Sequence, residues 1–121
     1  MKIHQSAEDY LESILTLQKK LGSVRSIDVV NDLGVSKPSV SVAMKKLREN
    51  GYIAMDADGH IILLSAGEAI ANKVYERHEL LTRFFTQLGV SAETAAADAC
   101  KVEHVLSQET FDCIKNQLSK Q

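Results

Sequence analysis

The chain has 121 residues, of which 45% are hydrophobic and 25% are charged. This composition is typical of a folded globular protein and excludes a disordered chain, and the length suits one domain, or one small domain with a short helical appendage. The formal net charge of -2 gives no overall attraction to nucleic acid. Any DNA binding must therefore come from a locally basic face.

The sequence carries no sign of export or of membrane insertion. No apolar run approaches the roughly 20 residues that span a bilayer, and the first five residues do not begin a signal-peptide core. We therefore expect a cytoplasmic protein. Without an export signal, Cys100 and Cys113 are interpreted as free thiols or ligands rather than as a disulfide.

Serines and glycines divide the first half of the chain into three predicted helices. The first, over 6–21, is predicted by apolar residues at helical spacing, namely Leu11, Ile14, Leu15 and Leu21. A shorter helix over 26–33 ends at Gly34. Ser36 is then expected to cap a third helix, in which the early Pro38 costs little and which stops at Asn50-Gly51. The apolar stripe of this third helix is Val40, Met44 and Leu47.

The second half of the chain is predicted to hold a β-hairpin and three more helices. Apolar runs at 52–55 and 61–64 flank a glycine-containing turn, which predicts the hairpin. A capping box at Ser65 and Glu68 then opens a long helix that ends at Gly89. Its apolar stripe is Ile70, Val74, Leu81, Phe85 and Leu88.

Ser91 and Ser107 are expected to cap two final helices, over 92–106 and 108–119. The predicted fold class is therefore mainly α, with a helical domain after a winged helix-turn-helix. The boundary is expected at the end of the hairpin, which gives domains over 1–64 and 65–121.

The order of the first predicted elements is that of a winged helix. Two helices joined by a short glycine-containing turn form a helix-turn-helix, and the following hairpin supplies a wing. The third helix and the wing hold eight residues that we expect to contact DNA: Lys37, Pro38, Ser39, Ser41, Val42, Lys45, Lys46 and His60. Ser39, Ser41 and Val42 are the candidates for base contacts. Lys37 and His60 are expected to flank them on phosphates.

Two interpretations of the basic face that Lys45, Lys46 and Arg48 form on the third predicted helix remain open. Lys45, Lys46 and Arg48 resemble the charge clusters that in most proteins are simply a solvated helix face. The predicted wing favours DNA binding, because an isolated solvated helix does not require one.

Six potential metal ligands lie on three predicted helices. They are Asp9, Glu12, His78, Cys100, Glu103 and His104. The first two are three residues apart and share a face of the first helix, and the last three follow i, i+3, i+4 spacing, so they should converge on one side of the penultimate helix. His78 is a polar residue on a stripe that should be buried. Thiolate, carboxylate and imidazole are ligand types for a transition metal.

Each of these residues also has a purely structural interpretation. Asp9 is typical of a helix start, where a carboxylate opposes the dipole, and Glu12 of a solvated surface. Cys100 is compatible with a small buried hydrophobe, His78 with a hydrogen-bonded core histidine, and Glu103 and His104 with exposed residues. The sequence alone leaves open whether the three helix faces meet.

Three segments resemble the diphtheria-toxin-repressor family of metalloregulators. They are Glu8-Asp9-Tyr10-Leu11-Glu12, Arg77-His78-Glu79-Leu80-Leu81 and Cys100-Lys101-Val102-Glu103-His104-Val105-Leu106-Ser107. The resemblance covers nearly the whole chain. It implies a winged helix, a helical dimerisation domain, metal bound between them, and metal-loaded dimers that repress genes of manganese or iron import. The chain ends before the C-terminal SH3-like domain of the iron-sensing branch, so the resemblance is to a short form.

The resemblance also assigns the ligands. All six candidates match ligand positions of the family's manganese branch, except that Cys100 stands where that branch has glutamate. The iron branch has cysteine there, but methionine where this chain has Asp9, so the set is a hybrid. Two ancillary ligands of the iron branch would fall at Thr82 and Ala96, which cannot serve. The thiolate favours Fe²⁺, Co²⁺ or Zn²⁺, whereas the other ligands suit Mn²⁺ and Fe²⁺, and we expect one primary ion.

The prediction is a metal-dependent homodimeric repressor of double-stranded operator DNA, and not an enzyme. A two-fold dimer would contact half-sites about one helical turn, roughly 34 Å, apart. The candidates for a shared dimer core are Phe84, Phe85, Leu88, Val105, Leu106 and Phe111. Two alternatives remain open: a metal-independent winged-helix regulator that responds to a small molecule or a protein partner, and a small metal or thiol enzyme that uses Cys100 with His104.

Overall fold

The computed structural model describes residues 5–120. The predicted domains, 1–64 and 65–121, include residues 1–4 and 121, which lie outside the described residues. The described chain is mainly α and separates into two compact units, Met1–Asn72 and Lys73–Gln121. The predicted boundary falls at the start of α4 (Ser65–Gln87), which begins in the first unit and continues into the second. Between residues 5 and 120, no helix has the length and apolar character needed to cross a membrane.

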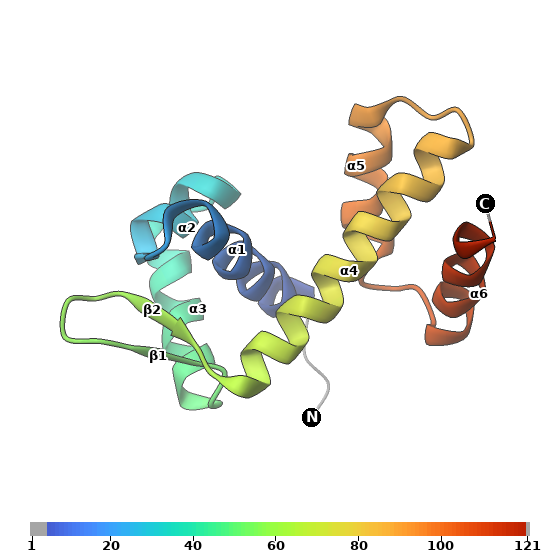
Figure 1. Ribbon diagram of the computed structural model, residues 1–121. Helices are drawn as coiled ribbons and strands as arrows, with labels where there is room; N and C mark the ends of the chain where they lie inside the picture. The colour runs from blue at the N-terminus through green and yellow to red at the C-terminus, as the bar shows by residue number, and fades with distance from the viewer. Residues whose placement is uncertain (1–4, 121) are drawn as a thin grey trace. The chain divides into compact units, whose positions relative to one another are not determined.

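The first unit is a winged helix (Figure 1). Before α4 its elements are α1 (Gln5–Leu21), α2 (Ser26–Leu33), α3 (Lys37–Glu49), β1 (Ile53–Met55) and β2 (Ile61–Leu63). The two strands pair antiparallel, with Ala54 opposite Ile62. Ile61 N–H donates to the Val24 carbonyl at 2.7 Å and ties the hairpin to the chain before α2. The predicted hairpin is confirmed, with each strand one residue shorter than expected.

Local signals set the ends of α2 and α3. At the start of α2, Arg25 N–H donates to the Asp28 carboxylate at 2.9 Å. Gly34 follows α2 with φ 68°, a left-handed conformation that glycine adopts without strain. Ser36 Oγ then accepts a hydrogen bond from Ser39 N–H and caps α3. The tight turn and the serine cap predicted between these helices are confirmed.

An apolar core holds the first unit together. Its members are Leu11, Ile14, Leu15, Leu17, Val24, Val29, Val40, Met44, Leu47, Ile53, Ile61 and Ala71. The predicted stripes of α1 and α3 are confirmed except at Leu21, which is 56% exposed. Leu21 is the last residue of α1 and lies beyond the covered part of the helix.

The hairpin meets the first turn of α4 through a glycine. Leu64 N–H donates to the Tyr52 carbonyl at 3.0 Å. A Cβ atom at Gly67 would lie only 2.1 Å from the same carbonyl oxygen. Glycine is therefore required at this position for the two backbones to approach.

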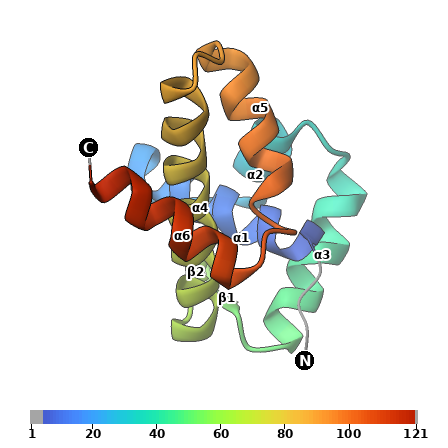
Figure 2. The same cartoon turned by 90° about the vertical axis from the view of Figure 1, so that its right-hand side faces the viewer.

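The second unit consists of the rest of α4 together with α5 (Ala92–Val102) and α6 (Gln108–Ser119). α5 lies alongside the C-terminal part of α4 in both ribbon views (Figure 2), and an ion pair of 2.8 Å joins Lys115 of α6 to Glu76 of α4. The buried apolar residues of this unit are Val74, Leu81, Ala95, Ala99, Phe111 and Leu118. The predicted stripe of α4 is wrong at Leu88, which follows the end of the helix and is 67% exposed.

The caps of the last two helices are as predicted, but one helix is shorter. Ser91 and Ser107 each accept a hydrogen bond from the N–H three residues further on. α5 ends at Val102, whereas the prediction extended to residue 106. Glu103 and His104 therefore lie in the turn that follows the helix.

Candidate metal centre and DNA-binding surface

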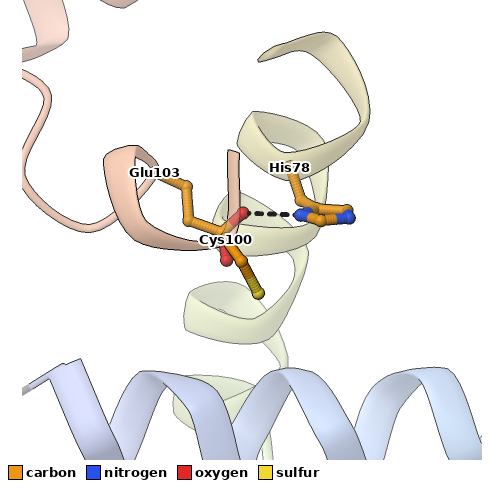
Figure 3. A group of neighbouring side chains, drawn as sticks. All are labelled: His78, Cys100 and Glu103. Carbon is orange, nitrogen blue, oxygen red and sulfur yellow. Dashed lines mark hydrogen bonds and ion pairs between the residues drawn. The ribbon is translucent and has the colours of Figure 1, made fainter. Parts of the chain in front are cut away.

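Three potential metal ligands of the second unit lie together (Figure 3). His78 projects from α4, Cys100 from α5 and Glu103 from the turn after α5, and one ligand atom of each lies within 4.8 Å of the others. His78 Nδ1 and Glu103 Oε2 are 2.9 Å apart, although the two residues are 25 positions apart in the sequence. The second unit thus brings an imidazole, a thiol and a carboxylate to one place.

Glu103 is the residue that makes this cluster suitable for a metal. It is 1% exposed, and its Oε1 accepts no hydrogen bond from the described residues. The same oxygen lies 3.4 Å from Nε2 of His104, whose side chain is also buried. Burying a carboxylate is costly unless a cation or hydrogen bonds compensate its charge. A metal ion fits here because it would supply that compensation directly, and imidazole and carboxylate are suitable ligands.

The second unit holds four of the six predicted ligands: His78, Cys100, Glu103 and His104. The prediction that the last three lie on one helical face is partly wrong, because His104 follows the end of α5. Glu103 keeps helical backbone angles of φ -57° and ψ -26°, so its side chain still approaches that of Cys100. Asp9 and Glu12 are half-buried residues of α1 in the first unit, and their role as ligands stays a prediction.

A buried arginine beside His78 is missing from the predicted site. Arg77 is 7% exposed and donates hydrogen bonds to two backbone carbonyls of the 103–106 turn. It lies three residues after Val74 and four before Leu81, on the buried stripe of α4. A charged residue at a core position of the periodic pattern is the signal that could have revealed it.

The DNA-binding candidates on α3 form an exposed surface of the first unit. Seven of the eight predicted residues are exposed: Lys37, Pro38, Ser39, Ser41, Val42, Lys45 and Lys46. The apolar Val42 is 55% exposed between polar neighbours. Such a side chain suits contact with a thymine methyl group, as serines suit contact with base edges or phosphates.

A shallow pocket between α2 and α3 lies beside this surface. It is lined by Ser26, Ile27, Val30, Lys37 and Ser41. Arg25, which precedes α2 and is exposed, reaches the turn of the wing, where a Cβ atom at Gly59 would lie 3.9 Å from its Nη1. This additional positive charge was not predicted from the sequence, since a single arginine before a helix carries no pattern.

The predicted wing contact, His60, is paired with an acid. Its Nδ1 is 3.2 Å from Asp56 Oδ2, and its backbone N–H donates to Asp56 Oδ1 at 2.8 Å. Asp58 N–H donates to the same oxygen at 2.9 Å. These hydrogen bonds, above all the one from the His60 backbone, lower the pKa of Asp56 below its ordinary value. The neighbouring carboxylate makes the wing less electropositive than the sequence suggested.

The fold and these two sites define a class of protein: a winged-helix DNA-binding protein with a helical metal-binding domain. Residues 2–61 match the family model described as iron dependent repressor, N-terminal DNA binding domain, and residues 65–120 match its metal binding and dimerisation domain. The transcriptional regulator MntR of Escherichia coli O6:H1 is 38% identical over 108 residues, 89% of this chain and 70% of that relative. The chain belongs to the iron-dependent repressor family and is a metal-dependent DNA-binding transcriptional repressor.

Other relatives support the same fold. The HTH-type transcriptional regulator MntR of Bacillus subtilis (strain 168) is 34% identical over 109 residues, 90% of this chain and 77% of that relative. The solved structure of the manganese regulator SloR is similar at a TM-score of 0.83 and 25% identity, over 98% of this chain and 55% of that chain. The structure of T. acidophilum IdeR, at 21% identity and a TM-score of 0.84, shares the fold over 98% of this chain and 55% of its own. The chain thus spans about half the length of these solved structures.

Proposed function

We propose that this protein is a cytoplasmic homodimer that binds double-stranded operator DNA when Mn²⁺ or Fe²⁺ is bound, and so represses uptake of that metal. The observation that carries this proposal is the buried Glu103 carboxylate, which lies 2.9 Å from His78 Nδ1 and has one oxygen without a hydrogen bond from the described chain. The similarity to the solved manganese regulator SloR supports a regulator of manganese, and the description of the family supports a regulator of iron. Co²⁺ and Zn²⁺ are further candidates because of the Cys100 thiolate.

The metal site would use all six predicted residues. The second unit would contribute His78, Cys100, Glu103 and His104, and α1 would add the carboxylates of Asp9 and Glu12. The metal ion supplies positive charge and directional bonds when bound. In this proposal the winged-helix domain would comprise residues 1–64, and the metal-binding and dimerisation domain residues 65–121.

A constraint on the position of α1 would also affect the DNA-binding surface on α3, because these helices pack together inside the first unit. α1 packs against both α2 and α3, and Ser13 of α1 donates a hydrogen bond of 2.7 Å to Asp32 of α2. Asp9 and Glu12 lie on α1. A metal ion bound to their carboxylates would restrict the movement of α1 and, through this packing, the position of α3. Metal can favour the DNA-binding conformation only by the difference between its affinities for the two conformations.

On DNA, α3 would occupy the major groove. Ser39, Ser41 and Val42 would face base edges, while Lys45 and Lys46 would bind phosphates. The remaining predicted contacts would flank them, with Lys37 and Pro38 in the first turn of α3 and His60 on the wing. Arg25 beside the wing is a further candidate for a phosphate contact.

A second copy of the chain would cover apolar residues of the second unit. Leu88 and Val105, at 67% and 78%, are the most exposed large apolar side chains among the described residues. Phe84, Phe85 and Leu106 are half-buried and would join them. Phe111 is only 4% exposed within its own subunit, so it belongs to the subunit core rather than to the shared one. Sedimentation at micromolar concentration with metal present should show a dimer; a monomer would contradict this arrangement.

The decisive experiment is a DNA-binding titration with and without metal. Sequences bound in the presence of Mn²⁺ would be selected from a random duplex pool, and affinity would then be measured by fluorescence anisotropy with Mn²⁺, Fe²⁺, Co²⁺ or chelator under anaerobic, reducing conditions. We expect a pseudo-palindromic sequence and a loss of affinity when chelator is added. Equal affinity with chelator would favour the metal-independent regulator. Failure to select any sequence would contradict the repressor function itself.

A further inference from the structure

We infer that Arg77 is a positioning residue that fixes the turn carrying Glu103 and His104 and thereby raises the metal affinity of the centre. Its role rests on the proposed function in one respect, namely that these two residues bind the metal. Arg77 is itself no ligand, because a guanidinium has only donors.

Backbone hydrogen bonds close part of the turn after α5, because the Val102 carbonyl accepts from the N–H groups of Val105 and Leu106 at 3.1 Å. The last four carbonyls of a helix make no hydrogen bond within the helix, and a glycine in left-handed conformation commonly helps to satisfy them. α5 ends without such a glycine, since Glu103 keeps a φ of -57° and no non-glycine residue in the described chain has a positive φ. The carbonyls of Glu103 and Leu106, which lie in the turn beyond α5, accept hydrogen bonds from a side chain of another helix.

Arg77 supplies this side chain. Its Nη1 donates to the carbonyl of Glu103 at 3.1 Å and to that of Leu106 at 2.7 Å, so one nitrogen holds both ends of the turn. Its Nη2 donates to Gln108 Oε1 at 3.1 Å, and its guanidinium lies 5.2 Å from the centre of the Phe111 ring. The arginine thus connects α4 to the turn and to the first part of α6.

The surroundings of Arg77 indicate that its charge interacts mainly with the backbone carbonyls of the turn. The side chain is buried, yet among the described residues its polar partners are two backbone carbonyls and an amide, and none is a carboxylate. A buried guanidinium without a carboxylate is costly, and its Nε is buried with no hydrogen-bond partner among the described residues, so the stabilisation must come from the Nη groups that bind the turn and Gln108. A lysine at this position could not reproduce the planar fork.

Glu103 is consequently held at two points by neighbouring residues of α4. Arg77 binds its backbone carbonyl, and His78 lies 2.9 Å from its carboxylate. One turn of α4 therefore provides a potential ligand and also orients the next one. Residues that orient metal ligands in this way typically change metal affinity about 10- to 100-fold when they are replaced.

The test compares the full-length protein with Arg77→Lys, which keeps the charge, and Arg77→Gln, which removes it. Co²⁺ would be the probe, since its absorption spectrum reports thiolate and carboxylate ligation. We expect both variants to bind Co²⁺ about 10- to 100-fold more weakly with an altered spectrum. In the metal-free variants, we expect faster hydrogen exchange of the Val105 and Leu106 amides, which both bond to the Val102 carbonyl.

Leu118→Ala is the matched control. Leu118 is 3% exposed in the same unit, so its loss lowers stability without removing a hydrogen bond from the turn. Its Co²⁺ affinity and spectrum should equal those of the wild type. Wild-type Co²⁺ affinity in Arg77→Lys, or an equal loss in Leu118→Ala at equal thermal stability, would overturn the positioning role. A wild-type protein that binds no Co²⁺ would instead overturn the proposed metal site, and the exchange rates of the metal-free turn would still show whether Arg77 holds it.

Discussion

Two histidine–carboxylate pairs in this protein have similar geometry and different surroundings. In the wing, His60 Nδ1 lies 3.2 Å from Asp56, and the two side chains are 29% and 39% exposed. In the second unit, His78 Nδ1 lies 2.9 Å from Glu103, and the side chains are 26% and 0% exposed. The first pair joins residues four apart, whereas the second joins residues 25 apart.

The difference lies in what already compensates each carboxylate. Asp56 accepts hydrogen bonds from the backbone N–H groups of Asp58 and His60 and is open to solvent. Asp56, Asp58 and His60 also offer ligand atoms within 4.8 Å of one another, as the buried cluster does. The wing acids are solvated, however, so they do not need an ion, whereas the buried Glu103 has an oxygen without a hydrogen bond from the described residues. Ligand spacing alone therefore does not distinguish a metal centre from a hydrogen-bonded turn.

The largest expected effect follows from removing the charge of Glu103. Glu103→Gln keeps the size of the side chain but replaces a carboxylate by a neutral amide. We expect Mn²⁺ affinity, measured by calorimetry, to fall by more than about 100-fold, because even residues that only orient ligands cost 10- to 100-fold. The metal-free variant should unfold at the same temperature as the wild type or higher, since a buried charge has been removed.

Asp56→Asn is the matched change in the wing. It also replaces a carboxylate beside a histidine by an amide, and it should leave Mn²⁺ affinity unchanged. If Asp56→Asn reduced metal affinity and Glu103→Gln did not, the assignment of the two pairs would be reversed.

The next effect concerns the exposed thiol of Cys100. Cys100→Ala should lower both metal affinity and metal-activated DNA binding while leaving the fold nearly intact, because the residue is exposed and little packing is lost. Cys100→Glu should shift the preference toward Mn²⁺, since a carboxylate is a harder ligand than a thiolate. Metal content and operator affinity would be measured under reducing, anaerobic conditions.

Cys113 provides the control for this change. It is also exposed but lies on α6, outside the cluster of potential ligands. Cys113→Ala should respond to metal as the wild type does. Equal metal affinity and equal activation in Cys100→Ala and the wild type would remove Cys100 from the site.

The fold was predictable where the chain signals its structure locally. Gly34 and Ser36 fix the turn of the helix-turn-helix through contacts within a few residues, so the limits of α2 and α3 follow from the sequence. The end of α5 was not predictable in this way. Arg77 holds the 103–106 turn from 26 residues away, and no local pattern marks its role.

The DNA-binding surface and the metal centre also differ in how far local sequence patterns predict them. The basic face of α3 follows from helical periodicity alone, because exposed residues only need to point away from Val40, Met44 and Leu47. The residue types of the metal cluster were recognisable, but the closeness of His78 and Glu103 depends on the packing of α4 against the end of α5. The pairing of His60 with Asp56 was missed because the hairpin turn, rather than its composition, brings the two together.

A moderate effect is expected from the lysines of α3. Lys45→Ala and Lys46→Ala should weaken binding to every DNA sequence, and each should reduce the slope of log affinity against log salt by about 1, because phosphate contacts release counterions. Ser39→Ala should instead reduce discrimination between sequences. Lys115→Ala is the control, since this exposed lysine pairs with Glu76 in the second unit. An unchanged salt slope in both α3 variants would show that this helix does not lie on the phosphates.

The smallest effect is the pH dependence of the wing. The pKa of Asp56 is lowered in the folded protein, chiefly by the hydrogen bond from the His60 backbone N–H. The ionised carboxylate therefore stabilises the turn above the pKa of the unfolded chain, and this contribution disappears as the pH falls through the lower, folded value. Because the pair is exposed, the change in global stability should be small, so it is best followed by NMR of the Asp58 and His60 amide protons during an acid titration. Their shifts should follow the titration of Asp56 in the wild type and lose that dependence in Asp56→Asn, and an Asp56 carboxyl that titrates at or above its ordinary pKa would show that these hydrogen bonds do not form in solution.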